Sequence, residues 1–242
     1  MAGRLVGAVE AGFRRLARLR RAPALHPTGL TCTAELEVVD DGGGSWGVPW
    51  LDTPGRYTAV VRLSRGAGLP ARLPDALGLA VRVEDAAAPG RPLDLLLTSS
   101  GSGRTVRRLP LPRADVLGGP YSTLLKYRVG ARHRLLAAFP RRDRAPVHGD
   151  PASLHRALAD GRLVVDLRAG TVGGTWRTFA VLTVGAPLPV PREESVDFDI
   201  YGNRLPEFGP GSALAAVRRA AYRGSRAGRH RARSRGHDRD SV

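Results

Sequence analysis

This sequence has a single cysteine, few aromatic residues and no long apolar run. The single cysteine, Cys32, rules out a disulfide within the chain and suits a reducing compartment, so we expect a cytoplasmic protein. No apolar run is long enough for a transmembrane helix, so we expect no membrane span. Aromatic residues make up only 5% of the chain, which leaves few side chains to stack on nucleic-acid bases.

Acidic residues are few relative to basic ones, and the formal charge is +16. Residues 1–21 carry +5 and residues 213–242 carry +7, which leaves +4 for the 191 residues between them. Lys126 is the only lysine among the 38 basic residues. The excess charge therefore sits at two basic ends, and we do not expect nucleic acid as the main partner. A module that uses these ends on RNA or on an anionic surface stays open as an alternative.

The length and composition predict one main domain between two basic segments. With 42% hydrophobic residues among 242, the chain can bury one sizeable core. Residues 1–21 predict an amphipathic helix, because apolar residues recur there at helical spacing. Residues 22–229 are expected to form a single domain, and residues 230–242 a disordered basic tail.

Alternating patterns predict a protein rich in β-strands. In "TCTAELEVV" (31–39), Cys32, Ala34, Leu36 and Val38 fall on one face, which predicts a strand with a buried, inert thiol. The other strands are expected at 56–64, 76–85, 93–100, 162–168 and 174–184. Helices are expected at 121–139 and 151–160. Asp75 and Asp94 are interpreted as strand-end or turn residues rather than as an acid/base pair.

The stretch "VRRAAYRGSRAGR" (217–229) predicts a helix with one polar stripe. Arg218, Tyr222, Ser225 and Arg229 stand at helical spacing, which puts a guanidinium one turn from a phenol oxygen. Geometry alone also allows a simpler arrangement, in which the tyrosine packs on the core and the arginines face water.

Four further motifs precede this stretch in a recognisable order. They are "LHPTG" (25–29), the Arg-x-Ser strand "AVVRLS" (59–64), "DALGLAVRVED" (75–85) and "LDLLLTSS" (93–100). Together with the late tyrosine helix, this series resembles the haem-dependent catalase superfamily over roughly residues 20–230. The resemblance implies an α+β fold: an antiparallel β-barrel core with flanking helices and a C-terminal helix that carries the proximal tyrosine. Residues 22–229 would then be one haem-binding domain with haem b as cofactor.

The resemblance also implies roles for six residues. Tyr222 falls on the axial ligand of the iron, and Arg218 on the arginine paired with that tyrosine. A phenol has a pKa of about 10, and an adjacent guanidinium favours the phenolate that binds ferric iron. The distal residues are His26, which would move a proton between peroxide oxygens, and Ser64, which would support it. Arg62 and Arg229 fall on the arginines that bind the haem propionates.

The chain departs from the family pattern at two of its positions. Thr98 stands where the family has a distal asparagine, so a hydroxyl replaces an amide. Pro23 stands where the family has an arginine before the distal histidine. We therefore expect a haem-dependent oxidoreductase with catalase, peroxidase or organic-hydroperoxide activity. A non-catalytic haem binder or sensor of the same fold is the alternative, and a homo-oligomer stays open.

Three other histidines raise the question of a hydrolytic metal site. His133, His148 and His155 fit no standard ligand spacing, and no carboxylate cluster accompanies them. We interpret them as surface residues.

Overall fold

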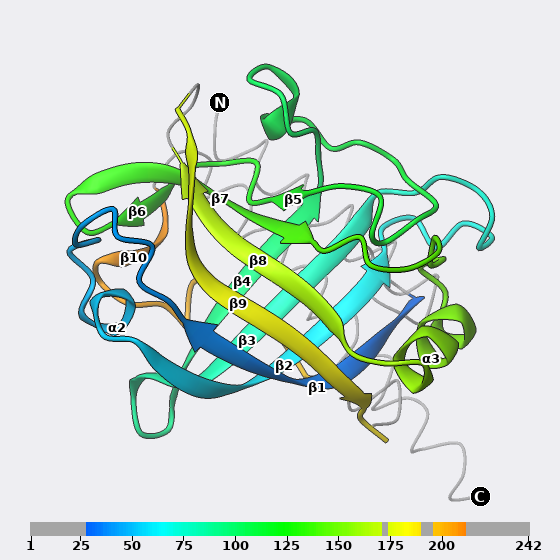
Figure 1. The fold of residues 1–242 in the computed structure, drawn as a ribbon, viewed down its shortest axis with the longest axis horizontal. Coiled ribbons are helices and arrows are strands. Elements are labelled where there is room, and N and C mark those ends of the chain that lie inside the picture. Colours follow the sequence, from blue (N-terminus) through cyan, green and yellow to red (C-terminus); the bar gives the residue numbers. More distant parts are fainter. Residues whose placement is uncertain (1–27, 171–173, 190–195, 212–242) are drawn as a thin grey trace, which may run out of the picture. The chain divides into compact units, whose positions relative to one another are not determined.

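The computed structural model of the chain describes residues 28–170, 174–189 and 196–211 (Figure 1). Eight antiparallel strands form a barrel in the order β7-β5-β4-β3-β2-β1-β9-β8, and a further pairing of β7 with β8 closes it. The expected antiparallel barrel is thereby confirmed for this part of the chain. Its strands are β1 (Thr28–Val38), β2 (Gly55–Arg65), β3 (Leu77–Ala88), β4 (Arg91–Ser99), β5 (Tyr121–Ser122), β7 (Arg132–Pro140), β8 (Leu163–Gly170) and β9 (Trp176–Pro187).

Short elements extend the barrel at its ends. β6 (Tyr127–Val129) pairs with β7 and with β10 (Phe208–Pro210), forming a small three-stranded extension. The described helices are α2 (Pro49–Asp52), α3 (Pro151–Ala159) and the 3-10 turn η1 (Val106–Arg108). The helix expected at 151–160 is confirmed as α3, whose first turn is capped by Asp150 accepting from Ser153 N at 3.0 Å. None of these helices is long and apolar enough to cross a membrane.

The prediction of a helix at 121–139 is wrong. The segment forms β5, β6 and β7 instead, with a turn at Gly130. Its leucines and alanines favour a helix locally, but β7 pairs with β5, β6 and β8, and these long-range pairings decide its conformation. Gly130 has φ of 57°, a backbone angle that glycine adopts without strain.

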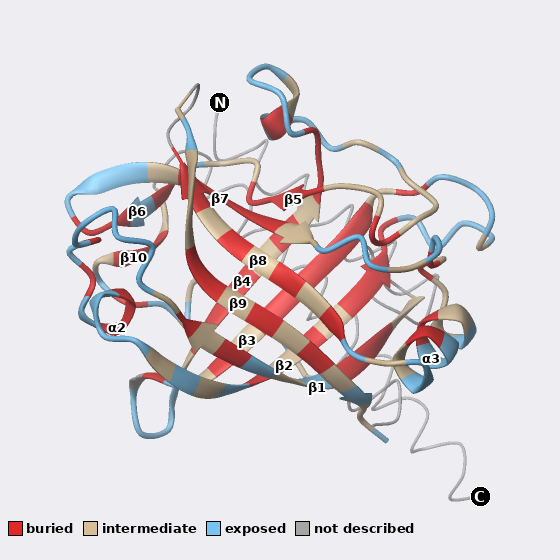
Figure 2. Cartoon of the chain, viewed as in Figure 1, coloured by how far each residue is buried: buried red, intermediate tan, exposed pale blue. Residues whose placement is uncertain are grey.

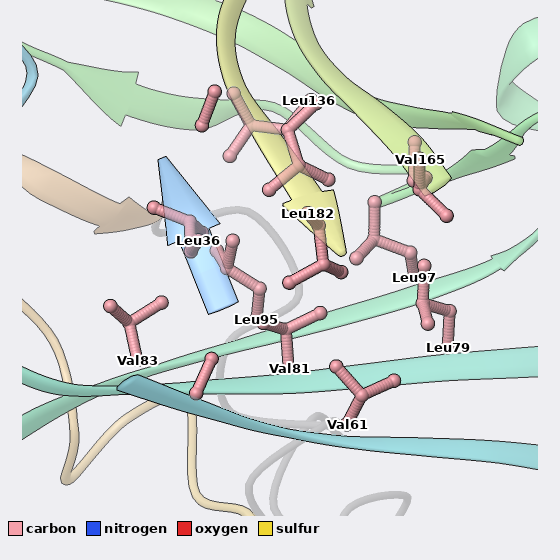
Figure 3. Close-up of a cluster of buried hydrophobic side chains, with 14 of the residues drawn as sticks. Leu36, Val61, Leu79, Val81, Val83, Leu95, Leu97, Leu136, Val165 and Leu182 are labelled. Carbon is pink, nitrogen blue, oxygen red and sulfur yellow. The ribbon is translucent and has the colours of Figure 1, made fainter. Parts of the chain in front are cut away.

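The barrel interior is a packed apolar core. Leu36 and Leu182, from the paired strands β1 and β9, and Val81, from β3, all point into this core (Figure 3). Figure 2 shows buried residues along all the long strands. Toward one end, a cavity lined by Leu63, Leu79 and other apolar residues has a volume of only about 10 Å³, too small for a ligand. This interior cavity therefore leaves no room for a cofactor.

Cys32 belongs to this core. It is fully buried on β1, as the alternating pattern predicts. Burial raises the pKa of its thiol to about 12, so the reactive thiolate is scarce at neutral pH. The prediction of a buried thiol is confirmed.

An ion pair joins the loop after β1 to the start of β9. Arg177 donates to the Asp41 carboxylate from Nε at 2.9 Å and from Nη2 at 2.6 Å. The same guanidinium lies 4.1 Å from the centre of the Trp46 ring. The hydrogen bond from Arg177 lowers the pKa of Asp41 below its usual value.

This ion pair predicts a specific pH dependence. A carboxyl whose pKa is lowered on folding stabilises the folded state above its unfolded pKa, and that stability is lost as pH falls through the folded pKa. We expect Asp41→Asn to lower the free energy of unfolding by about 1–2 kcal/mol at neutral pH. The difference from the wild type should shrink as pH falls below about 4. Urea unfolding at several pH values measures it. Asp40→Asn is the control, since Asp40 accepts a backbone bond from Gly42; an equal effect there would contradict the assignment.

Candidate functional site

Arg62 and Ser64 lie on the outer face of β2. Their neighbours Val61 and Leu63 are buried in the core, and alternate residues of a strand point to opposite faces. Arg62 is half-buried and Ser64 is buried, so this outer face is not an open, solvated surface. The strand thus presents a guanidinium and a hydroxyl on one side, as the sequence predicts.

The strand register brings Thr98 to the same face. Ser64 pairs with Gly78 on β3, and Gly78 pairs with Thr98 on β4, so one strand separates the two hydroxyl residues. A second row, one step along, runs from Thr31 through Arg62 to Ala80. Three of the described sequence-predicted residues therefore lie on one outer surface of β2 and β4. We name this surface the outer face; its residues are Gly29, Thr31, Arg62, Ser64, Gly78, Ala80 and Thr98.

Hydrogen bonds orient two of its polar side chains. Arg62 donates from Nη1 to Thr31 Oγ1 at 3.3 Å, across the β1–β2 pair. Ser64 donates from Oγ to the Gly78 carbonyl at 3.4 Å. Thr31, whose side chain is buried, was not singled out in the sequence; only the register of β1 against β2 reveals it.

The outer face has one cation, Arg62, next to residues with small side chains or none. A guanidinium matches a carboxylate in shape and charge, because its N–H donors form a planar fork. Gly29 and Gly78 have no side chain and Ala80 has only a methyl group, so a flat group can approach the sheet beside Arg62. Gly29 leaves no room for more, since an added Cβ would lie 2.9 Å from Ser64 Cβ.

A buried arginine fixes the loop that follows Ser64. Arg65 is 1% exposed and donates to the carbonyls of Leu69, Pro70, Ala71 and Leu73. Asp75 accepts backbone bonds from Ala67 and Leu69 at the other end of the loop. Asp75 forms an isolated β-bridge with Arg113 two residues before β3, which fits the expected position at a strand end, and this network holds the end of β2.

Asp94 corrects the sequence interpretation. It lies in the middle of β4 rather than at a strand end or in a turn, and its side chain is fully buried. Arg82 on β3 donates to both of its oxygens, at 2.8 and 2.7 Å, and this hydrogen bonding raises the pKa of Arg82. The antiparallel register of β3 against β4 pairs the two residues. The sequence signal was one charged residue in each of two adjacent strands, Arg82 in β3 and Asp94 in β4. Only the strand register shows that these two residues face each other.

The same carboxylate also binds the segment that precedes residue 212. Asp94 Oδ2 accepts two bonds, one from Asp199 N at 2.6 Å and one from Asn203 Nδ2 at 2.9 Å. Asp94 N in turn donates to the Asn203 carbonyl. Arg82 reaches the Asp197 carbonyl at 2.9 Å. We name Arg82, Asp94, Asp199 and Asn203 the Asp94 clamp.

Four predicted site residues fall outside the described ranges. They are His26, Arg218, Tyr222 and Arg229. Their roles stay predictions, and of the candidate site only Arg62, Ser64 and Thr98 have a described position.

None of the three histidines considered for a metal site lies on the strands of the outer face. His133 is exposed on β7, His148 bridges the backbone of Asp115, and His155 is exposed on α3. Within the described residues, no group of three or more His, Cys, Asp or Glu side chains could hold a metal ion.

Comparisons with known proteins bear on the fold. No family model matches the chain, and no curated protein matches it. Three similar solved structures are a fungal catalase, a bacterial catalase and catalase A from Saccharomyces cerevisiae. Their TM-scores are 0.61, 0.61 and 0.60, at sequence identities of 12%, 10% and 11%.

These alignments cover most of this chain but less of the catalases. They include 85%, 89% and 89% of this chain, and 60%, 59% and 63% of the respective catalases. Similarity of structure at such low identity establishes architecture. The chain therefore has a catalase-like barrel fold.

Proposed function

We propose that the chain binds haem b against the outer face and uses it in peroxide chemistry. The observation that carries the proposal is the meeting of Arg62, Ser64 and Thr98 on one surface of a catalase-like barrel. The sequence motifs that contain these three residues resemble those of the haem-dependent catalases. The apolar interior of the barrel directs polar strand residues outward in any case, and the register adds that Ser64 and Thr98 stand in one row with Gly78 between them.

The outer face suits this cofactor in its chemistry. A haem propionate is a carboxylate, and Arg62 offers it a half-buried guanidinium. The planar porphyrin suits a surface of low relief, which Gly78 and Ala80 provide on the neighbouring strand. Arg229 would bind the second propionate, and Tyr222, with its pKa lowered by Arg218, would bind the iron.

The distal residues would manage protons. Haem iron, when bound, supplies the redox chemistry that cleaves the peroxide O–O bond. His26 would take a proton from one peroxide oxygen and return it to the other, acting first as a base and then as an acid. Ser64 would orient His26. Thr98 would offer a hydroxyl on a shorter side chain in place of the asparagine amide, so peroxidase or organic-hydroperoxide turnover fits the site as well as disproportionation does.

Haem titration tests the proposal. We expect the purified protein to give a Soret band with haem, and Tyr222→Phe to lose or strongly shift the high-spin ferric spectrum. The matched control is Tyr57→Phe, because Tyr57 stacks on Trp50 at 5.9 Å within the barrel and should leave the spectrum unchanged. The absence of any Soret change on titration would refute haem binding. An unchanged spectrum in Tyr222→Phe would refute the ligand assignment alone.

A further inference from the structure

The charges of the described chain are unevenly distributed. Residues 101–134 contain eight Arg or Lys and a single acidic residue, Asp115. The other described residues contain 14 Arg and 16 Asp or Glu. One continuous segment is therefore strongly cationic, while the rest of the barrel is slightly acidic.

Five of these cations are exposed and have no ion pair within the described ranges. We name them the cationic edge: Arg104, Arg108, Lys126, Arg128 and Arg132. Elsewhere on the barrel, arginines such as Arg56 and Arg141 pair with carboxylates even where they are exposed. The single acid of the segment, Asp115, instead accepts backbone bonds from Leu117 and Val147.

Contacts with the backbone bring four residues of the cationic edge together, namely Arg108, Lys126, Arg128 and Arg132. Arg108 donates from Nε to the Leu124 carbonyl at 3.3 Å, which fixes the η1 turn beside the chain that leads into β6. Lys126 and Arg128 flank the buried Tyr127 and so share the opposite, exposed face. Figure 2 shows exposed residues along the hairpin of β6 and β7, where Arg132 begins the second strand.

Local electrostatics agree with a concentration of positive charge here. Arg134, two residues after Arg132, has its pKa lowered first by burial and then by the neighbouring guanidinium groups of Arg132 and Arg177. An anionic partner at this edge would relieve that repulsion.

The uncharged residues of the segment distinguish between anionic partners. Leu109, directly after Arg108, is 53% exposed, the largest exposed fraction among the described large hydrophobic residues. The two aromatic side chains of the segment, Tyr121 and Tyr127, are both buried. The exposed ring that this described segment offers to RNA bases is the single imidazole of His133, whereas a leucine among unpaired cations suits the interface of a lipid bilayer.

We propose that the cationic edge docks on membranes that contain anionic phospholipids, with Leu109 entering the headgroup region. The cations attract the lipid phosphates, and each contributes separately because each is exposed and has no competing carboxylate. This binding is peripheral and does not depend on haem.

Vesicle sedimentation with the full chain tests the proposal. We expect binding to vesicles that contain phosphatidylglycerol, little binding to pure phosphatidylcholine, and release at high salt. The double variant Arg108→Gln and Arg128→Gln should bind the anionic vesicles roughly thirtyfold more weakly, since each cation near the surface contributes a factor of about five. Leu109→Ser should weaken the binding that remains at intermediate salt.

The control removes the same charge elsewhere. Arg72 and Arg91 are exposed, and Arg91 begins β4 at the opposite end from Ser99. Arg72→Gln with Arg91→Gln leaves both basic chain ends and the cationic edge intact.

Equal loss of vesicle binding in both double variants would overturn the proposal, as would the absence of binding to anionic vesicles. If the Arg108/Arg128 variant lost affinity for single-stranded RNA but not for vesicles, the edge would be a nucleic-acid surface instead. Matching melting curves exclude misfolding.

Discussion

Replacing Asp94 by alanine is expected to lower the free energy of unfolding by about 3–5 kcal/mol. Its side chain is fully buried and accepts bonds from Arg82, Asp199 N and Asn203. Removing the carboxylate leaves the Arg82 charge, which is only 17% exposed, without its partner. It also leaves two further donors without an acceptor. Denaturant unfolding followed by circular dichroism measures the effect.

The control for Asp94 is a carboxylate in an exposed ion pair. Glu35 Oε1 lies 3.5 Å from Arg56 Nη1, and the side chains of Glu35 and Arg56 are 50% and 66% exposed. Glu35→Ala should cost no more than about 1 kcal/mol, because water screens and replaces the interaction. If the two alanine variants were equally stable, the Asp94 clamp would have no special role. The clamp would also tie residues 197–203 to the barrel, so Asp94→Ala should increase proteolytic cleavage in that segment.

Replacing His26 by alanine is expected to reduce peroxide turnover by about 10²–10⁴-fold, the usual contribution of a positioned acid–base group. Haem affinity should change little, because the proposed ligand and propionate contacts come from Tyr222, Arg62 and Arg229. Stopped-flow measurement of peroxide consumption, normalised to the Soret absorbance, separates turnover from loading. This expectation depends on the proposed haem site.

His155→Ala is the matched control for His26. His155 is exposed on α3, which is not one of the strands of the outer face, and its replacement should leave turnover unchanged. Loss of haem together with turnover in His26→Ala would show that the histidine supports the fold or the cofactor rather than the proton transfer. Unchanged turnover would reject the distal role and favour a passive haem binder.

Strands such as β1, β2 and β8 were readable from the sequence because their two faces differ. On β1, Cys32 and Leu36 face the core while Glu35 and Glu37 face out, and this contrast marks a strand at first sight. β7 gives no such contrast, since Leu135, Leu136, Ala137 and Ala138 are all buried. When a short run is apolar on both faces, its periodicity does not distinguish a strand from a helix. The leucines and alanines of this run favour a helix, and the prediction based on them was wrong.

The candidate site was only partly predictable for a similar reason. That Arg62 and Ser64 share a face follows from their spacing alone. That Thr98 joins them depends on the register of three strands, and Thr31 enters only through β1. Asp94 was misinterpreted because its partners Asp199 and Asn203 lie more than a hundred residues away along the chain.

The pairing of β1 with β9 constrains the order in which the barrel is made. β1 can pair with β2 early, but its other edge waits for β9, where Leu36 meets Leu182. At a synthesis rate of about 5–20 residues per second, the ribosome needs roughly 10–30 s to add the intervening chain. During that interval the first strand exposes an unpaired backbone edge next to apolar side chains, a combination that promotes aggregation. Newly made chains of this protein therefore pass through an open sheet that chaperones would need to shield until β9 has emerged.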